Sequence, residues 1–261
     1  MEVAQDFSPA RRGRNSASSS PSTCAIVGWL FAYEPYKHLK NSFNIYGVLR
    51  PSPERAMDEP RQGGIYNDYC ITTVDNERSK AVFIHEFGHN FAGLADEYYT
   101  SDVAYNDFYP KGVEPLEPNI TALLDPAHVK WADLVSPGIS IPTDYGKDAR
   151  DPLLAERQKI RQARMKALAD ARAGKASDAD LKAIETKYAE LDKPIAARLD
   201  ALQKKYGWLE DKVGAFEGAG YAAKGLYRPA WYCIMISSPK DEFCPVCQRA
   251  IERMVQAYTA Q

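Results

Sequence analysis

His85 and His89 stand in a His-Glu-x-x-His run, the pattern that helices use to bind catalytic zinc. In a helix they lie one turn apart on the same face, so both imidazoles can reach one metal ion. Glu86 follows the first histidine and is placed to act on a metal-bound water. Zinc lowers the pKa of that water towards about 7, and a neighbouring carboxylate can take the proton as hydroxide attacks a carbonyl. The pattern predicts peptide-bond hydrolysis; the alternative is a pair of core histidines bonded to backbone carbonyls.

The segment around this motif has the pattern of a buried helix. An apolar run from Lys80 to Ile84 leads directly into the motif. Asp75 or Asn76 is the expected cap at the helix start, and Gly93 is expected to end the helix. This helix must hold both histidines towards the metal.

A catalytic zinc usually has three protein ligands and one open position for water. No third histidine follows the motif closely, but the turn at Gly93 is followed by two acids, Asp96 and Glu97. We expect Asp96 to be the third ligand, because its short side chain comes first after the reversal. Glu97 would then point to the other side of an extended segment. Spacing alone leaves Glu97 and Glu217 open as alternatives.

Several blocks of the sequence recur together, in one order, in a known family. The blocks are residues 63–67, 85–98, 216–221, 225–229, 233–235 and 243–247. They resemble the IgA-peptidase family of bacterial zinc metallopeptidases, and the run from His85 to Tyr98 is similar to its signature almost residue for residue. The resemblance covers roughly residues 32–142 and 213–251.

The resemblance implies an α/β fold, a metzincin-like zincin catalytic domain with a mixed sheet, an active-site helix and a methionine turn. Met235 corresponds to the turn methionine. The segment 65–74 is the candidate strand that lines the cleft and pairs with substrate backbone, although an ordinary internal strand fits equally well. The resemblance also implies one catalytic Zn²⁺ ion, a protein or peptide substrate, and a secreted or cell-surface enzyme. The chain shows no clear signal peptide.

A tyrosine or an arginine near the methionine turn could stabilise the oxyanion that forms when the carbonyl is attacked. Tyr227 is the first candidate, followed by Tyr221 and Arg228. All three could instead be packing residues. Glu217, besides being a rival ligand, could orient a histidine.

The cysteines are Cys24, Cys70, Cys233, Cys244 and Cys247. The last three allow three hypotheses. A zinc ribbon needs a fourth ligand nearby in the sequence, and a thioredoxin-like redox pair needs a βαβ setting; neither is present. A disulfide from Cys233 to Cys244 or Cys247, clamping the methionine turn to the last helix, suits an exported enzyme best.

The expected organisation is a flexible leader at 1–23, a catalytic domain formed by 24–150 and 207–261, and an inserted antiparallel helical hairpin at 151–206. Apolar residues recur in the second half of the hairpin at helical spacing: Leu181, Ile184, Tyr188, Leu191, Ile195, Leu199, Leu202 and Tyr206. The hairpin is either a solvated scaffold or an arm that docks a partner or substrate.

Turn and cap residues divide this hairpin. Gly174 would end its first helix, and Ser177 with Asp180 resembles the start of the second. Pro194 is expected to divide the second helix, with Asp192 as a new cap.

Composition agrees with a soluble globular protein. The chain has 261 residues, 45% of them hydrophobic, and a formal net charge of −2. Such a near-neutral balance argues against nucleic acid as a partner, and no run approaches the length of a membrane span.

Together these features predict a zinc-dependent endopeptidase with Glu86 as general base. A zinc hydrolase acting on another amide is a rival within enzymes. A second hypothesis is a truncated, catalytically inactive homologue that acts as a binding or structural module through its helical arm. It is based on the missing N-terminal β-rich domain of the family and on the short segment before residue 63.

Overall fold

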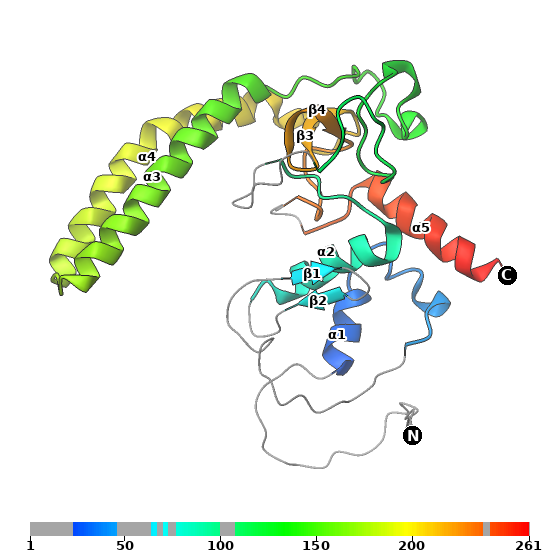
Figure 1. Ribbon diagram of the computed structural model, residues 1–261, viewed down its shortest axis with the longest axis horizontal. Helices are drawn as coiled ribbons and strands as arrows, with labels where there is room; N and C mark the ends of the chain where they lie inside the picture. The colour runs from blue at the N-terminus through cyan, green and yellow to red at the C-terminus, as the bar shows by residue number, and fades with distance from the viewer. Residues whose placement is uncertain are drawn as a thin grey trace, which may run out of the picture.

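The computed structural model describes residues 23–45, 64–66, 70–72, 77–99, 108–236 and 241–260. These residues form helices and two small sheets (Figure 1). The helices are α1 (Thr23–Leu30), α2 (Ser79–Ala92), α3 (Lys147–Ala173), α4 (Asp178–Tyr206) and α5 (Pro245–Thr259). The strands are β1 (Gly64–Tyr66), β2 (Cys70–Thr72), β3 (Phe216–Ala219) and β4 (Ala222–Arg228). Short 3₁₀ turns lie at Lys40–Ser42, Pro126–His128, Ala132–Leu134 and Gly207–Leu209.

Both sheets are two-stranded and antiparallel. In the first, β1 pairs with β2 and both pack against α2. In the second, β3 pairs with β4, with a bulge between Glu217 and Ala219. The expected single mixed sheet is therefore not formed by the described residues. The expected strand at 65–74 is instead part of the β1–β2 hairpin, and residues 67–69 and 73–74 lie outside the description.

Helix α2 begins at Ser79 and ends where the sequence predicts. Its N-cap is Arg78, without a side-chain cap hydrogen bond, and the expected caps Asp75 and Asn76 lie outside the described residues. Gly93 adopts φ +60°, and its N–H bonds the carbonyls of Gly88 and His89. Only glycine enters this left-handed region without strain, so Gly93 ends the helix and turns the chain back.

The main core packs α2 against α5, the segment after α1 and the residues around Met235. Tyr36 is fully buried, and its ring contacts Phe43, Phe87, Phe91 and Phe243 at centroid distances of 5.4–6.2 Å. These aromatic contacts hold the face of α2 that carries Phe87 and Phe91, and His85 and His89, each two positions earlier, project from a different face. Within the described residues, every helix is too short or too polar to cross a bilayer.

Helices α3 and α4 run side by side and project from the rest of the molecule (Figure 1). Arg157 pairs with Asp192 at 2.8 Å and Arg164 with Glu185 at 3.5 Å, a register that makes the two helices antiparallel. Helix α3 starts at Lys147, slightly before the expected boundary at Asp151.

The local signals at the turn between these helices are confirmed, but one prediction is wrong. Gly174 is the C-cap of α3, and Ser177 forms a capping box with Asp180 at the start of α4. Pro194 does not divide α4, which continues through it, and Asp192 caps no new helix; its carboxylate binds Arg157. Because Pro194 is exposed, water can satisfy the carbonyl that loses its helical partner.

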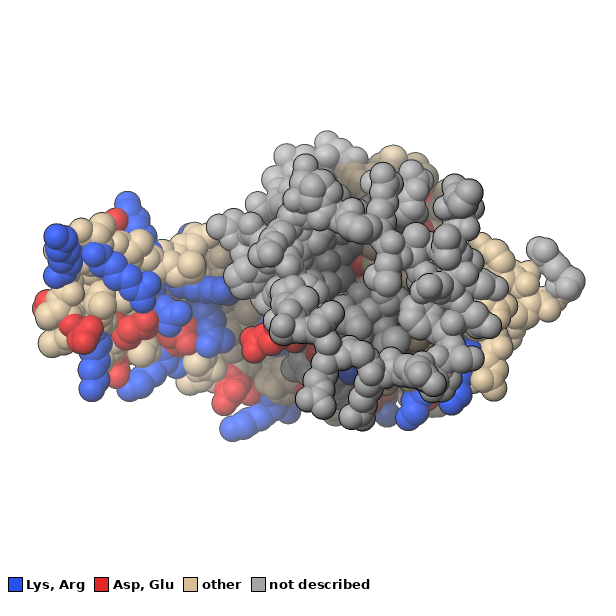
Figure 2. Space-filling view, turned by 90° about the horizontal axis from the view of Figure 1, so that it is seen from below, with Lys and Arg blue, Asp and Glu red and all other residues tan. Residues whose placement is uncertain are grey.

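The two helices bury only a narrow stripe. Ile195 is buried, and the other members of the predicted stripe are partly buried, except Leu191, which is 48% exposed. On the face seen in Figure 2, charged side chains of both signs are spread over the arm among uncharged ones. Exposed ion pairs contribute only about 0–1 kcal/mol each, so the arm depends on its apolar stripe and its base.

The base of the arm is bonded to the body next to the segment that follows α2. Asp151 accepts hydrogen bonds from the Tyr99 hydroxyl at 2.6 Å and from Lys147 Nζ at 2.7 Å. Arg150 lies over the Trp231 ring at 4.9 Å. Among the described residues, the contacts between the arm and the body are therefore concentrated at the base of the arm, and its outer part makes few.

We expect the outer arm to be dispensable for folding. Residues 158–191 are replaced with a short Gly/Ser turn that joins Arg157 to Asp192. This change keeps the contacts between the base of the arm and the body. The midpoint of thermal unfolding should change by less than about 4 °C, equivalent to about 1 kcal/mol in a domain of this size.

Asp151→Ala in the full chain is the matched control. It removes the carboxylate that accepts from the Tyr99 hydroxyl and the Lys147 ammonium, so it should lower the midpoint by more than the shortened arm does. Loss of the cooperative transition on shortening would show that the outer arm completes the main core.

Candidate metal centre

Three side chains converge beside α2. His85 and His89 project from the helix, and Asp96 comes back to them after the reversal at Gly93. His85 Nε2 and His89 Nε2 lie 3.0 Å apart. Asp96 Oδ1 lies 3.1 Å from the first and 3.3 Å from the second. The structure therefore brings together the three residues that the sequence proposes as ligands.

Backbone carbonyls fix the orientation of both imidazoles. His85 Nδ1 is 2.9 Å from the carbonyl oxygen of Ile234, and His89 Nδ1 is 2.6 Å from that of Leu94. A carbonyl can only accept, so each Nδ1 must carry the proton and donate it. In the neutral ring Nε2 is then the lone-pair nitrogen, which is the atom that faces Asp96.

The donor set fits a cation. Two Nε2 lone pairs and the Asp96 Oδ1 atom face one another, and this buried oxygen has no hydrogen-bond partner of acceptable geometry. Buried acceptors that face one another are unfavourable unless something positive lies between them. Imidazole and carboxylate ligands with one position left open are typical of catalytic zinc.

The pKa shifts of His85 and Asp96 agree with this arrangement. Burial favours a neutral His85 ring, but the contact with the Asp96 carboxylate outweighs burial and raises the pKa of His85. Burial also opposes ionisation of Asp96, yet the two imidazoles outweigh it and lower the pKa of that carboxyl. Asp96 is therefore held as a carboxylate, the form that binds metal.

Glu86 lies on α2 beside these candidate ligands and is largely buried, with 9% of its surface exposed. Burial raises the pKa of Glu86, while the nearby His85 and His89 act in the opposite direction. A carboxyl group next to the metal position, itself outside the ligand set, is what the motif predicts for a proton acceptor.

The turn at Met235 supports the centre from below. Met235 is fully buried, and its carbonyl accepts the N–H of Glu97 at 2.9 Å. A Cβ atom at Gly88 would lie 3.2 Å from the Met235 sulfur and 3.1 Å from the Phe243 ring. Glycine within the motif therefore lets the turn approach α2 closely enough for the Ile234 carbonyl to reach His85.

Tyr221, the second candidate for stabilising an oxyanion, lies at this centre. Its hydroxyl donates to Asp96 Oδ2 and lies 3.2 Å from the Tyr98 hydroxyl. Burial, and then the hydrogen bond to Asp96, raise the pKa of Tyr221. Its N–H bonds the Tyr98 carbonyl at 3.0 Å, and the N–H of Gly220 bonds the Asp96 carbonyl at 2.9 Å. The turn between β3 and β4 is thus bonded to the segment that carries Asp96.

The other candidates lie in the β3–β4 pair. Tyr227 is opposite Glu217 and exchanges backbone hydrogen bonds with Thr121. Glu217 Oε1 accepts the N–H of Gly225 at 3.2 Å. Arg228 donates to the carbonyls of Glu217 and Gly218. In the described part of the chain, these interactions join none of the three to the converging histidines, and the role of Tyr227 stays a prediction.

The expected disulfide is not formed. Cys233, Cys244 and Cys247 are buried free thiols, and Cys233 Sγ lies 3.7 Å from Cys247 Sγ, far beyond a bonded distance of about 2.05 Å. The side chain of Cys24 lies outside the description, and Cys70 is a half-buried free thiol.

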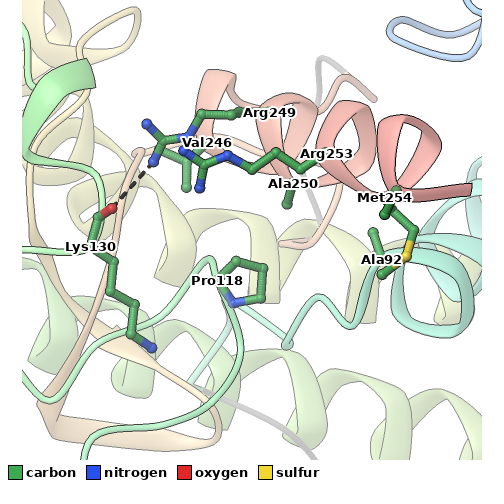
Figure 3. Close-up of a pocket in the computed structure, with 9 residues that line it drawn as sticks. Ala92, Pro118, Lys130, Val246, Arg249, Ala250, Arg253 and Met254 are labelled. Carbon is green, nitrogen blue, oxygen red and sulfur yellow. Dashed lines mark hydrogen bonds between the residues drawn. The ribbon is translucent and has the colours of Figure 1, made fainter. Parts of the chain in front are cut away.

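Two pockets formed by described residues are lined by none of His85, His89 and Asp96. One, of about 380 Å³, lies along α5 and is lined by Ala92, Lys130 and Arg249 among others (Figure 3). Two of its three cations are bonded within the protein: Lys130 Nζ donates to the carbonyls of Glu117 and Ile120, and Arg249 donates to Asp133. The other, of about 220 Å³, is lined by Tyr98, Trp231, Tyr232 and Ile236 among others.

Comparison with known proteins identifies the family. The family described as IgA Peptidase M64 matches residues 61–255, a span that contains all the residues of the candidate centre. No curated protein matches the chain. The match agrees with the family that the sequence motifs suggest. Because it covers well over half of the 261 residues, this chain belongs to the IgA peptidase M64 family, a family of metallopeptidases.

Proposed function

We propose that this protein is a zinc-dependent endopeptidase that hydrolyses peptide bonds of protein substrates. The observation that carries the proposal is the convergence of His85 Nε2, His89 Nε2 and Asp96 Oδ1 within 3.3 Å, on rings whose Nδ1 atoms are fixed by carbonyls. Membership of a metallopeptidase family supports the reaction class.

His85, His89 and Asp96 are the proposed ligands of one catalytic Zn²⁺ ion. When bound, zinc supplies Lewis acidity that acidifies water and polarises a carbonyl group. The carbonyls of Ile234 and Leu94 hold the imidazoles in the tautomer that binds metal. Tyr221 holds the second oxygen of Asp96, which leaves Oδ1 for the ion.

Glu86 is the proposed general base. It is on the same helix as both histidines and close enough for their charges to affect its pKa. Its carboxylate accepts a proton from the attacking water and later delivers it to the leaving amine, so the nitrogen departs as a neutral amine.

For the oxyanion, the contacts favour Tyr221 over Tyr227. The Tyr221 hydroxyl lies on Asp96 itself, next to the metal position, whereas Tyr227 contacts the strand opposite it. A hydroxyl whose pKa is raised keeps its proton, and this role requires Tyr221 to turn its one O–H from Asp96 Oδ2 to the developing negative charge when substrate is bound.

The turn of Ile234, Met235 and Ile236 supports a metzincin-like architecture, because it passes beneath α2 and orients His85. The helices α3 and α4 are proposed to be an insertion that acts as scaffold or docking arm. Secretion of a bacterial enzyme remains an expectation from the family resemblance. The inactive-homologue alternative has less support, since Glu86 and the proposed ligands are all present and assembled.

Glu86→Gln tests the mechanism. The amide keeps the shape of the side chain but cannot accept the proton, so cleavage of an unfolded protein substrate should fall by about 10²–10⁴-fold. Zinc content, measured by elemental analysis, should stay unchanged.

Glu217→Gln is the matched control, because Glu217 is a partly exposed carboxylate outside the centre. It should keep full turnover. Undiminished cleavage by Glu86→Gln would disprove the proposed base, and a wild-type protein that holds zinc but cleaves nothing would support the binding-module alternative.

Asp96→Ala tests the third ligand. Changes to residues that only orient a ligand typically weaken metal binding about 10–100-fold, so loss of a ligand should weaken zinc binding at this centre by more than about 100-fold. Competition with a chelator measures this affinity. Glu217→Ala, which removes the rival ligand, should leave it unchanged, and the reverse outcome would transfer the ligand role to Glu217.

A further inference from the structure

A second group of potential metal ligands lies in the core, separate from the histidines. Cys233, Cys244, Cys247 and Glu97 each offer one atom, and the four atoms lie within 4.8 Å of one another. All four residues are buried, with at most 4% of their surface exposed. They come from the methionine turn, the start of α5 and the segment that carries Asp96.

The spacing of the sulfurs fits a shared metal better than a disulfide. Cys233 Sγ and Cys247 Sγ are 3.7 Å apart. Two thiolates that bind one zinc at about 2.3 Å in tetrahedral geometry are separated by about 3.8 Å.

Glu97 supplies a buried carboxylate with an unused oxygen. Oε1 accepts a hydrogen bond from Asn119 Nδ2 at 2.9 Å and lies 3.1 Å from Cys247 Sγ. Oε2 is buried and has no partner. Asn119 also bonds the N–H and the carbonyl of Ala95, so the carboxylate is held in place. Burial raises the pKa of Glu97, so the ionised carboxylate needs a cation beside this orphaned oxygen.

The local structure also suits thiolate ligands. Cys244 and Cys247 have the C-x-x-C spacing of structural zinc sites, at the first turn of α5. Cys244 is the N-cap but makes no side-chain cap hydrogen bond, and its N–H points to Cys233 Sγ at 3.3 Å. An amide that donates to sulfur stabilises the thiolate form, as does a helix N-terminus.

We propose that Cys233, Cys244, Cys247 and Glu97 bind a second zinc ion with a structural role. The four ligands leave no open position, as in structural zinc sites. No fourth ligand lies near the three cysteines in the sequence; the fold instead brings Glu97 to them from 150 positions before Cys247, far outside the local spacing of a ribbon.

The ion would join three segments that build the candidate metal centre. Asp96 and Glu97 are adjacent and point to different sides, one to the histidines and the other to the thiols. The second site therefore fixes the peptide that presents Asp96, and it ties this peptide to α5 and to the turn beneath α2.

The decisive measurement is metal content in the absence of the histidine ligands. Wild-type protein, purified with a reductant and dialysed, should hold about two zinc ions per chain. The His85→Ala/His89→Ala variant should hold about one. A folded histidine variant without zinc would overturn the proposal.

Cobalt gives a readout that needs no cysteine variant to fold. The same histidine variant, exchanged with Co²⁺, should show the strong near-ultraviolet sulfur-to-cobalt charge transfer and the visible bands of tetrahedral cobalt. Absence of the charge transfer, or a Cys233–Cys247 disulfide in freshly purified protein analysed without reductant, would overturn the proposal.

Two substitutions then assign the ligands. Glu97→Gln, made in the histidine variant, should weaken cobalt binding and alter the visible bands. Cys70→Ser is the matched control, because Cys70 is a free thiol outside the cluster and bonds the Phe83 carbonyl. It should leave the spectrum unchanged, and a spectrum that depends on Cys70 would contradict the ligand assignment.

Discussion

The reversal of the chain at Gly93 is the constraint on which the candidate centre depends. The left-handed turn sends residues 94–99 back along α2. Most residues of that segment then make a specific contact at or near the centre. The Leu94 carbonyl orients His89, and Asp96 faces both histidines. Glu97 turns into the core. A helix that continued past Gly93 would carry these groups away from the motif.

The same segment is bonded on both sides by parts of the chain that come much later. The Glu97 N–H binds the Met235 carbonyl, and the turn at Tyr221 binds Asp96 and Tyr98. The segment therefore cannot shift without breaking backbone hydrogen bonds, whose loss in a buried setting is unfavourable. Such support gives a metal centre a fixed shape before the metal arrives.

Local patterns predicted the parts of this centre that depend on neighbouring residues. The spacing of His85 and His89, the end of α2 at Gly93 and the capping box at Ser177 all follow from interactions within a few positions. The contacts of Tyr221 with Asp96 and of Glu97 with Cys247 span 125 and 150 positions. Rules based on neighbouring residues cannot predict which tyrosine contacts Asp96 or which acid contacts Cys247. For Pro194 the local rule gave a wrong prediction. The rule that proline interrupts a helix considers only the lost backbone hydrogen bond, whereas at this exposed position water can bind the carbonyl that has lost its partner.

The arm formed by α3 and α4 has a consequence for the order in which the protein folds. The arm is an antiparallel pair of helices joined by a short turn, so its contacts can form outwards from that turn and its helices can pair early, whereas the centre requires contacts between segments up to 150 positions apart. Once the helices pair, Tyr206 lies against Gly146, and the two ends of the arm are neighbours. The β-bridge between Thr143 and Phe216 then closes a loop that is effectively short, because the paired helices already hold residues 146 and 206 together. The entropic cost of closing that loop is therefore lower. The arm, although it has few contacts with the body, can in this way speed the pairing of β3 with the segment that precedes α3.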